Sequence, residues 1–199
     1  MDSKGWDHRY SGSELIWTAE PNRFLAAEAA DLAGGVALDL ACGEGRNAVW
    51  LAQRGWQVTG VDFSQVGLDK AARLAEQRGV SVQWVLADVR GYVPPPAAFD
   101  LVTVCYLHIS GPAMSDVLRL AAAALAPGGT LLVVGHDPTN IEEGYGGPQS
   151  AAILVAPDQI VEALRDLHIE RAERVLRPIA SAGEHVYAID ALVRAVRPR

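Results

Sequence analysis

Cysteine is scarce in this chain, since only Cys42 and Cys105 occur among its 199 residues. Both fall at the ends of predicted buried strands, so we expect two buried thiols rather than a disulfide or a metal-ligating pair, and no metal site is expected. The chain also lacks the run of about 18 apolar residues that a membrane-spanning helix needs. Its first ten residues, MDSKGWDHRY, have no apolar core typical of a secretory signal. These absences predict a cytoplasmic protein.

Basic residues are also few, and they do not cluster. The chain has 17 Lys and Arg against 24 Asp and Glu, for a formal net charge of -7. Because binding to nucleic acid or to an anionic membrane needs clustered Lys and Arg, we expect neither partner. No internal repeat, low-complexity tract or linker divides the 199 residues, which are too few for two typical domains. One domain over residues 1–199 is therefore predicted, and the sequence leaves its oligomeric state open.

The stretch from residue 36 to residue 64, VALDLACGEGRNAVWLAQRGWQVTGVDFS, organises the rest. It predicts a buried strand (36–41), a glycine turn (42–45), a helix (46–54) and a second strand (57–62). This is a βαβ unit with a nucleotide-type pocket at its first turn. Gly43 and Gly45 let the backbone approach a ligand closely. Asp62 follows about 20 residues later, where an acid can accept the hydroxyls of a ribose.

The charges of the turn help to identify the ligand, because Gly43, Gly45 and Ala48 also satisfy the pattern of dinucleotide enzymes. A pyrophosphate is repelled by carboxylates such as Asp39 and Glu44, whereas the ammonium and sulfonium of S-adenosylmethionine are attracted by them. The series D-L-A-C-G-E-G followed by V-D-F-S resembles the class I S-adenosylmethionine-dependent methyltransferases. An NAD-dependent oxidoreductase remains the weaker alternative.

The remaining chain alternates between helical and strand patterns, and the resemblance covers most of it. The implied fold is α/β: a single-domain, Rossmann-like, mostly parallel sheet of seven strands with helices on both faces and a C-terminal antiparallel hairpin. The last two strands are predicted to be joined through Pro178 and Gly183. Further helices are predicted over residues 21–32, 64–78, 112–126 and 157–167, and further strands over residues 82–87, 99–106, 130–136, 169–176 and 185–196.

Two segments without clear periodicity flank the predicted cofactor-binding core, residues 34–136. Residues 1–20 contain Trp6, Tyr10 and Trp17, and we expect a flap across the pocket, because aromatic walls suit an adenine and a sulfonium. The alternative is that these aromatic side chains only pack on the edge of the sheet. Residues 137–156 form a long glycine-containing loop, which predicts a lid or binding loop.

The resemblance also implies roles for individual residues. Asp39 and the Gly43 turn would hold the methionine portion, Asp62 the ribose, and Phe63 the adenine. Asp88 and Val89 would read the adenine edge, while the backbone at Cys105 or Tyr106 would flank the sulfonium. The implied cofactor-binding residues are Asp39, Ala41, Gly43, Gly45, Asn47, Asp62, Phe63, Ser64, Asp88, Val89, Cys105 and Tyr106, with Trp17 and Tyr10 closing over the top.

Motifs outside this core point to a small-molecule branch of the class. R-Y-S followed by W-x3-P-N, and the later G-H-D-P-T-N, resemble the tellurite-resistance and thiopurine types of methyltransferase. The D-P-P-Y or N-P-P-Y of enzymes that methylate amino groups of DNA bases is missing, and C-Y-L-H stands in its place. The expected partner is therefore a small-molecule acceptor.

The predicted chemistry is transfer of a methyl group to a sulfur, oxygen or nitrogen atom of that acceptor by in-line displacement. Alignment and exclusion of water are the main requirements, and oxygen or neutral nitrogen acceptors gain from a positioned base. His108 is the candidate base, with Tyr106 and His136 behind it. The alternative for His108 is a loop histidine that shapes the acceptor pocket or bonds a backbone carbonyl, and His136 is better explained as a strand-end residue that supports the lid. A protein that binds S-adenosylmethionine without catalysis is the alternative function.

Overall fold

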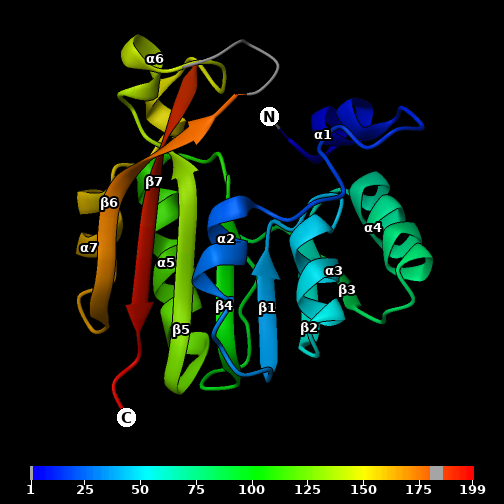
Figure 1. Ribbon diagram of the computed structural model, residues 1–199, viewed down its shortest axis with the longest axis horizontal. Helices are drawn as coiled ribbons and strands as arrows, with labels where there is room; N and C mark the ends of the chain where they lie inside the picture. Colours follow the sequence, from blue (N-terminus) through cyan, green and yellow to red (C-terminus); the bar gives the residue numbers. More distant parts are fainter. Residues whose placement is uncertain (1, 180–185) are drawn as a thin grey trace.

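The sheet is built outward from β1 (Val36–Leu40), whose five residues are apolar apart from Asp39. In the computed structural model, which describes residues 2–179 and 186–199, the strand order is β3-β2-β1-β4-β5-β7-β6 (Figure 1). Every pair is parallel except the two that β7 makes with β5 and β6. The other strands are β2 (Gln57–Asp62), β3 (Gln83–Leu86), β4 (Phe99–Cys105), β5 (Leu125–His136), β6 (His168–Pro178) and β7 (Tyr187–Val196).

Helices cover both faces of this sheet. In Figure 1, α2 (Arg23–Glu28) and α3 (Arg46–Gln53) lie in front of it, and α5 (Gly111–Ala124) and α7 (Pro157–Ala163) lie behind it. Two hydrophobic clusters match these layers, one containing Leu25 and Leu51 and the other containing Val117 and Ile160. The predicted fold class is confirmed, and the predicted start of the last strand at residue 185 and the link through Gly183 lie outside the described residues.

Helix α1 (Ser3–Tyr10) was not predicted, helix α2 begins later than predicted, and the predicted start of helix α4 (Gln65–Gln77) is confirmed. Helix α1 begins after Asp2, whose side chain accepts a hydrogen bond from Gly5 N at 2.9 Å. Its residues are mostly polar and only Tyr10 is buried, which explains why no apolar period revealed it. Helix α2 begins at Arg23 rather than Pro21, because Asn22 caps it. The cap predicted at Ser64 is confirmed for α4.

The loop predicted over residues 137–156 contains two short helical turns, α6 (Asn140–Glu143) and η1 (Ala151–Ile153). The Asn140 side chain holds this loop against β7, because its Oδ1 accepts a hydrogen bond from Ile189 N at 2.7 Å. Its Nδ2 donates to the Gly146 carbonyl at 2.9 Å. Movement of the loop as a lid stays a prediction. None of the helices in the described part of the chain is long and apolar enough to cross a membrane.

A buried ion pair anchors the segment that follows α1. Lys70 of α4 and Glu44 of the first turn are 5 % and 3 % exposed, and their side chains meet at 3.0 Å. Glu44 also accepts hydrogen bonds from the backbone N–H groups of Ile16 and Trp17, at 3.0 to 3.2 Å. Lys70 Nζ donates to the Glu14 carbonyl at 2.6 Å. The pair therefore holds residues 14–17 against the turn.

Replacing Lys70 with Met should lower the free energy of unfolding by about 3–5 kcal/mol, because it leaves the Glu44 carboxylate buried without its cation. Urea denaturation measures this loss. The matched control is Arg165→Met, which breaks the Arg165–Glu162 pair, 2.7 Å long and 75 % and 70 % exposed, and should cost less than about 1 kcal/mol. Equal losses in the two variants would contradict an anchoring role for the buried pair.

Candidate functional site

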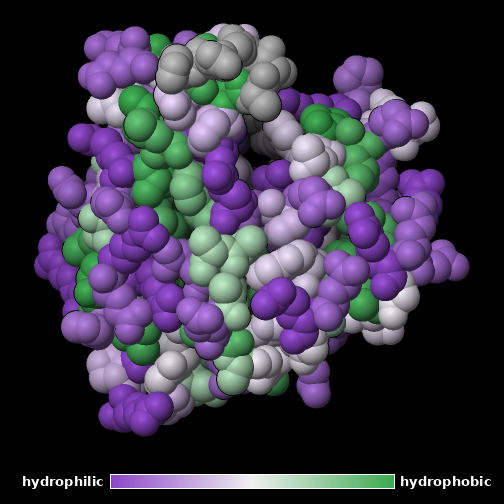
Figure 2. All heavy atoms as spheres, in the orientation of Figure 1, coloured by the Kyte–Doolittle hydropathy of each residue, from purple (hydrophilic) through white to green (hydrophobic). Residues whose placement is uncertain are grey.

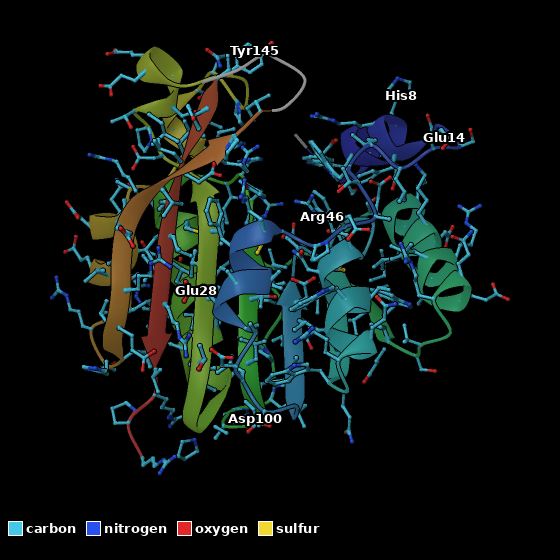
Figure 3. All side chains as sticks on the ribbon, viewed as in Figure 1. His8, Glu14, Glu28, Arg46, Asp100 and Tyr145 are labelled. Atoms are coloured by element: carbon cyan, nitrogen blue, oxygen red, sulfur yellow. The ribbon has the colours of Figure 1, made fainter. Side chains whose placement is uncertain are left out.

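A cavity of about 660 Å³ lies at the carboxyl ends of β1, β2 and β4. This is the edge at which parallel α/β sheets bind ligands, and the volume is in the range of roughly 300–1,000 Å³ found for small-molecule sites. Figure 2 shows the surface hollowed beside α1, and Figure 3 places Arg46 at the same end of the molecule and Asp100 at the opposite end. Twelve of the predicted site residues line the cavity: Tyr10, Trp17, Ala41, Gly43, Asn47, Asp62, Phe63, Asp88, Val89, Cys105, Tyr106 and His108.

The backbone turns sharply into the cavity at the ends of β1 and β4. Ala41 and Tyr106 have φ angles of 58° and 56°, which non-glycine residues rarely adopt. Such backbone strain gathers at functional sites. Both residues line the cavity. The two strained positions therefore mark the edge of the sheet where a ligand would lie.

The two glycines of the first turn have different roles. Gly43 lines the cavity, and a Cβ added there would lie 2.9 Å from the Tyr10 hydroxyl. Gly45 does not line it. A Cβ added at Gly45 would lie 2.6 Å from the Ala71 side chain and 2.8 Å from that of Trp84. Gly45 is therefore needed for packing against α4 and β3, rather than for the predicted approach to the ligand.

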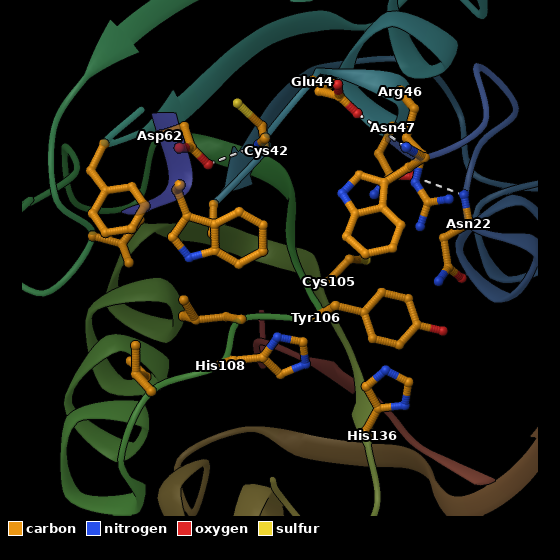
Figure 4. A pocket seen from close by; sticks show the side chains of 18 of the residues that line it. Asn22, Cys42, Glu44, Arg46, Asn47, Asp62, Cys105, Tyr106, His108 and His136 are labelled. Carbon is orange, nitrogen blue, oxygen red and sulfur yellow. Dashed lines mark hydrogen bonds between the residues drawn. The ribbon is translucent and has the colours of Figure 1, made fainter. Parts of the chain in front are cut away.

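Asp62 connects the end of β2 to the first turn. Its Oδ2 accepts a hydrogen bond from Gly43 N at 2.8 Å (Figure 4). Its Oδ1 accepts one from Ser64 N at 2.9 Å. Burial raises the pKa of this carboxyl group, while the N–H groups of Ser64 and Gly43 oppose that rise. Each carboxylate oxygen can accept a second hydrogen bond, so Asp62 can still take a hydroxyl from the cavity. Ser64 itself is not on the cavity wall.

Asp39 lies behind the cavity wall rather than on it. Its Oδ1 accepts a hydrogen bond from Thr103 Oγ1 at 2.7 Å, and its buried Oδ2 has no partner among the described residues. Burial raises the pKa of this carboxyl group to about 7. Glu44, the other acid expected to attract a cationic ligand, is neutralised by Lys70. These two acids therefore attract a cationic ligand less strongly than the sequence indicated, although the unpartnered Oδ2 leaves Asp39 able to accept a hydrogen bond from an ammonium.

Asp88 and Val89 lie on the cavity wall as predicted, beside Phe63. The guanidinium of Arg90 pairs with the Asp88 carboxylate and holds the pKa of Asp88 below its usual value. Val89 is buried and Phe63 is half-buried, so the two offer apolar surface to a planar ring. The predicted adenine end therefore has both an acid and apolar walls, with Arg90 as an unpredicted partner of the acid.

The three predicted catalytic candidates gather at the other end of the cavity. Figure 4 shows Asp62 in the upper part of the view and His108 and His136 in the lower part, below Cys105 and Tyr106. The two imidazole rings stack with their centroids 5.5 Å apart. Burial lowers the pKa of His108 to about 4, with the charges of His136 and Arg9 adding to the effect. His108 is therefore neutral at pH 7.

Tyr106 is not available as a base in this arrangement. Its hydroxyl donates a hydrogen bond to Asp190 Oδ2 at 2.8 Å. Burial and the charge of Asp190 raise the pKa of the phenol well above its usual value. Burial likewise raises the pKa of the Cys105 thiol, which makes this side chain an inert part of the wall.

Several residues of the site were missed in the sequence. Arg177 of β6 lines the cavity, and its Nε donates to Asp190 at 2.7 Å. Asp190 is fully buried in β7, within the apolar run Y-A-I-D-A-L-V. An acid in a strand that is otherwise apolar was the available sign of a functional or structural partner. Asn22 was missed too, and its backbone N–H donates to Asn47 Oδ1 at 2.8 Å on the cavity wall.

The residues present fit S-adenosylmethionine. Asp62 offers carboxylate lone pairs at the sharp first turn, and Asp39 has an unpartnered buried oxygen behind it. Phe63 and Val89 supply the apolar walls that an adenine needs. When bound, this cofactor supplies an electrophilic methyl group.

Comparisons with known proteins agree with this fit. Residues 37–129 match the family described as "Methyltransferase domain". The demethylmenaquinone methyltransferase of Thermus thermophilus is 38% identical over 103 residues, which are 51% of this chain and 47% of that protein. The chain spans less than half the length of the curated relatives it matches first.

Solved structures match over nearly the whole chain. The N-methyltransferase NodS from Bradyrhizobium japonicum, in complex with S-adenosyl-L-homocysteine, has a TM-score of 0.74 at 17% identity and covers 99% of this chain and 98% of its own. TehB from Haemophilus influenzae has a TM-score of 0.74 at 15% identity and covers 98% of this chain and 66% of its own. These likenesses show the fold. The family match adds that residues 37–129, within this fold, are similar to methyltransferase domains.

Proposed function

We propose that this protein transfers a methyl group from S-adenosylmethionine to a small-molecule acceptor. The observation that carries the proposal is the buried Asp62 carboxylate, which is held by Gly43 N and Ser64 N on the wall of the cavity and within the matched residues. The names of the similar proteins, which include a demethylmenaquinone methyltransferase and an N-methyltransferase, support a small-molecule acceptor.

Different residues along the cavity would bind different parts of the cofactor. Asp88, Val89 and Phe63 would hold the adenine, and Asp62 would accept the ribose hydroxyls. Ala41 and the Gly43 turn would hold the methionine portion, with Asp39 behind them accepting from its ammonium. Trp17 and Tyr10 line the mouth, where they would exclude water from the sulfonium.

His108 is well placed to contact an acceptor, since it lies on the cavity wall next to Tyr106. Its neutral imidazole can accept a proton at pH 7, but a base with a pKa of about 4 is a weak one. Its Nε2 is buried without a partner among the described residues. These properties favour the alternative role of His108, in which it shapes the acceptor pocket and hydrogen-bonds the acceptor.

Two other functions use the same cavity differently. A protein that binds the cofactor without catalysis would leave every acceptor of a panel of thiols, phenols, carboxylates and amines unmethylated. An NAD-dependent oxidoreductase would bind NADH in place of S-adenosyl-L-homocysteine. An acid at the position of Asp62 suits the ribose of either cofactor, so the binding experiment below separates the two.

Asp62→Asn should weaken the binding of S-adenosyl-L-homocysteine by roughly 10- to 150-fold, because an acceptor carrying a full negative charge contributes about 1.5–3 kcal/mol to its hydrogen bonds. Isothermal titration calorimetry measures the change. The control is Asp158→Asn at an exposed position of α7, which should bind as the wild type does. Unchanged affinity in Asp62→Asn, or tight binding of NADH by the wild type, would overturn the proposal.

The stability of the protein should depend on His108 at acid pH. In the unfolded chain this histidine binds a proton near pH 6.5, and in the folded protein only near pH 4. Because the unfolded state then holds more protons between these values, the free energy of unfolding falls as the pH falls from about 6.5 to about 4. His108→Asn should flatten this part of the profile, measured by urea denaturation at several pH values, whereas His168→Asn at an exposed position should not. A profile that His108→Asn leaves unchanged would contradict the buried, neutral imidazole.

A further inference from the structure

Asp190 joins three side chains that line the acceptor end of the cavity. Its carboxylate is fully buried. Oδ2 accepts hydrogen bonds from the Tyr106 hydroxyl at 2.8 Å and from Arg177 Nε at 2.7 Å. Oδ1 lies 3.1 Å from Nδ1 of His136. His136 and Asp190 are cross-strand partners at the end of β5 and in β7, so the pairing of the two strands sets this contact.

The Asp190 carboxylate is ionised despite its burial. Burial acts to raise its pKa, but the donors His136, Arg177 and Tyr106 and the positive charge of Arg177 hold the pKa below its usual value. Arg177 Nε and the Tyr106 hydroxyl donate to Oδ2, while Oδ1 faces the imidazole and also accepts a longer hydrogen bond from Arg177 Nη2 at 3.5 Å. His136 therefore has a negative oxygen beside one of its two ring nitrogens.

The ring of His136 is packed closely by its neighbours. His108 stacks on it with an interplanar angle of 10°, and the Tyr106 ring lies 4.9 Å away. At Gly147, where φ is 75°, an added Cβ would lie 3.0 to 3.1 Å from three atoms of the imidazole, so the glycine backbone covers it closely. Since Nδ1 faces Asp190, Nε2 is the ring nitrogen that remains for a ligand in the cavity that His136 lines.

We propose that His136 is the general base for an uncharged hydroxyl acceptor and that Asp190 is its positioning residue. This inference rests on the methyltransferase function proposed above. In the reaction, the acceptor oxygen bonds to the methyl carbon, the carbon–sulfur electron pair stays on sulfur, and the hydroxyl proton passes to His136 Nε2 and then to water. Asp190 keeps the proton of the neutral imidazole on Nδ1 and stabilises the imidazolium that forms, as a carboxylate does in a His–Asp pair.

The surroundings favour His136 over His108 as the base. A carboxylate lies beside His136, whereas burial lowers the pKa of His108 to about 4. The same cavity is also lined by the apolar side chains of Leu107, Ile109 and Ile153. They suit an aromatic ring that carries a hydroxyl group, and such a hydroxyl needs a base, unlike a thiolate.

The contact between His136 and Asp190 is not yet a well-aligned hydrogen bond, because Nδ1 has no partner of good geometry among the described residues. Catalytic hydrogen bonds are often poorly aligned without substrate and tighten in the complex. The relevant property is therefore the position of the imidazole proton rather than the present angle.

Two-bond ¹H–¹⁵N correlation spectra report directly which ring nitrogen of His136 carries the proton. They are recorded on the full chain with S-adenosyl-L-homocysteine at about pH 9, where an ordinary imidazole is neutral. His136→Gln assigns the signal by its loss. We expect the proton on Nδ1 in the wild type and on Nε2 in Asp190→Asn, whose amide can donate to Nδ1. Asp137→Asn is the matched control, since Asp137 is also fully buried and pairs with Arg174 at 3.0 Å instead of a histidine.

A wild-type proton on Nε2, or a tautomer that Asp190→Asn leaves unchanged, would overturn the inference. If Asp190→Asn does not fold, the wild-type spectrum alone tests the inference, because it shows whether the His136 proton is on Nδ1 or on Nε2. Failure of the wild type to bind S-adenosyl-L-homocysteine in calorimetry would overturn the proposed function instead, so the two failures are distinguishable.

The choice of acceptor gives a second test. His136→Gln should lower kcat for 4-methylphenol by about 10²-fold or more. It should change little for thiophenol, which reacts as its thiolate, and it should leave affinity for S-adenosyl-L-homocysteine unchanged. Equal losses for both acceptors would overturn the role of base. If the wild type binds S-adenosyl-L-homocysteine but methylates neither 4-methylphenol nor thiophenol, the assignment of an aromatic hydroxyl acceptor would be overturned.

Discussion

The site depends on the two hydrogen bonds that Asp62 accepts from Gly43 N and Ser64 N. They fasten the first turn and the start of α4 to the end of β2, so three elements meet at one buried carboxylate. Ser64 extends the arrangement, since its hydroxyl donates to Asp7 of α1 at 2.6 Å. Asp62 and Ser64 therefore link the end of β2 to α1.

A second polar centre, around Asp190, organises the far end of the cavity. Like Asp62, Asp190 is a buried carboxylate that faces several hydrogen-bond donors. Its partners come from the end of β4, from β5 and from β6. Buried charges of this kind are stable only when they are paired and hydrogen-bonded. The cavity thus lies between two such centres, one suited to the cofactor and the other to an acceptor.

The fold and much of the cavity lining could be predicted from the sequence because their determinants are local. The apolar run before Gly43 and the acid at Asp62 lie within one βαβ unit, and twelve predicted residues line the cavity. The roles of Glu44 and Asp39 could not be predicted, because they depend on Lys70 and Thr103, which are 26 and 64 positions away. Asp190 was missed for the same reason, since β7 meets β5 only through the topology of the sheet. Helix α1 was missed because it buries too little to show an apolar period.

The most direct test of this account is a crystal structure of the protein with S-adenosyl-L-homocysteine. The account predicts the ribose hydroxyls on the Asp62 carboxylate, the adenine between Phe63 and Val89, and the sulfur facing the Tyr106 end of the cavity. An adenosyl group bound elsewhere, or a ribose that Asp62 does not contact, would contradict it.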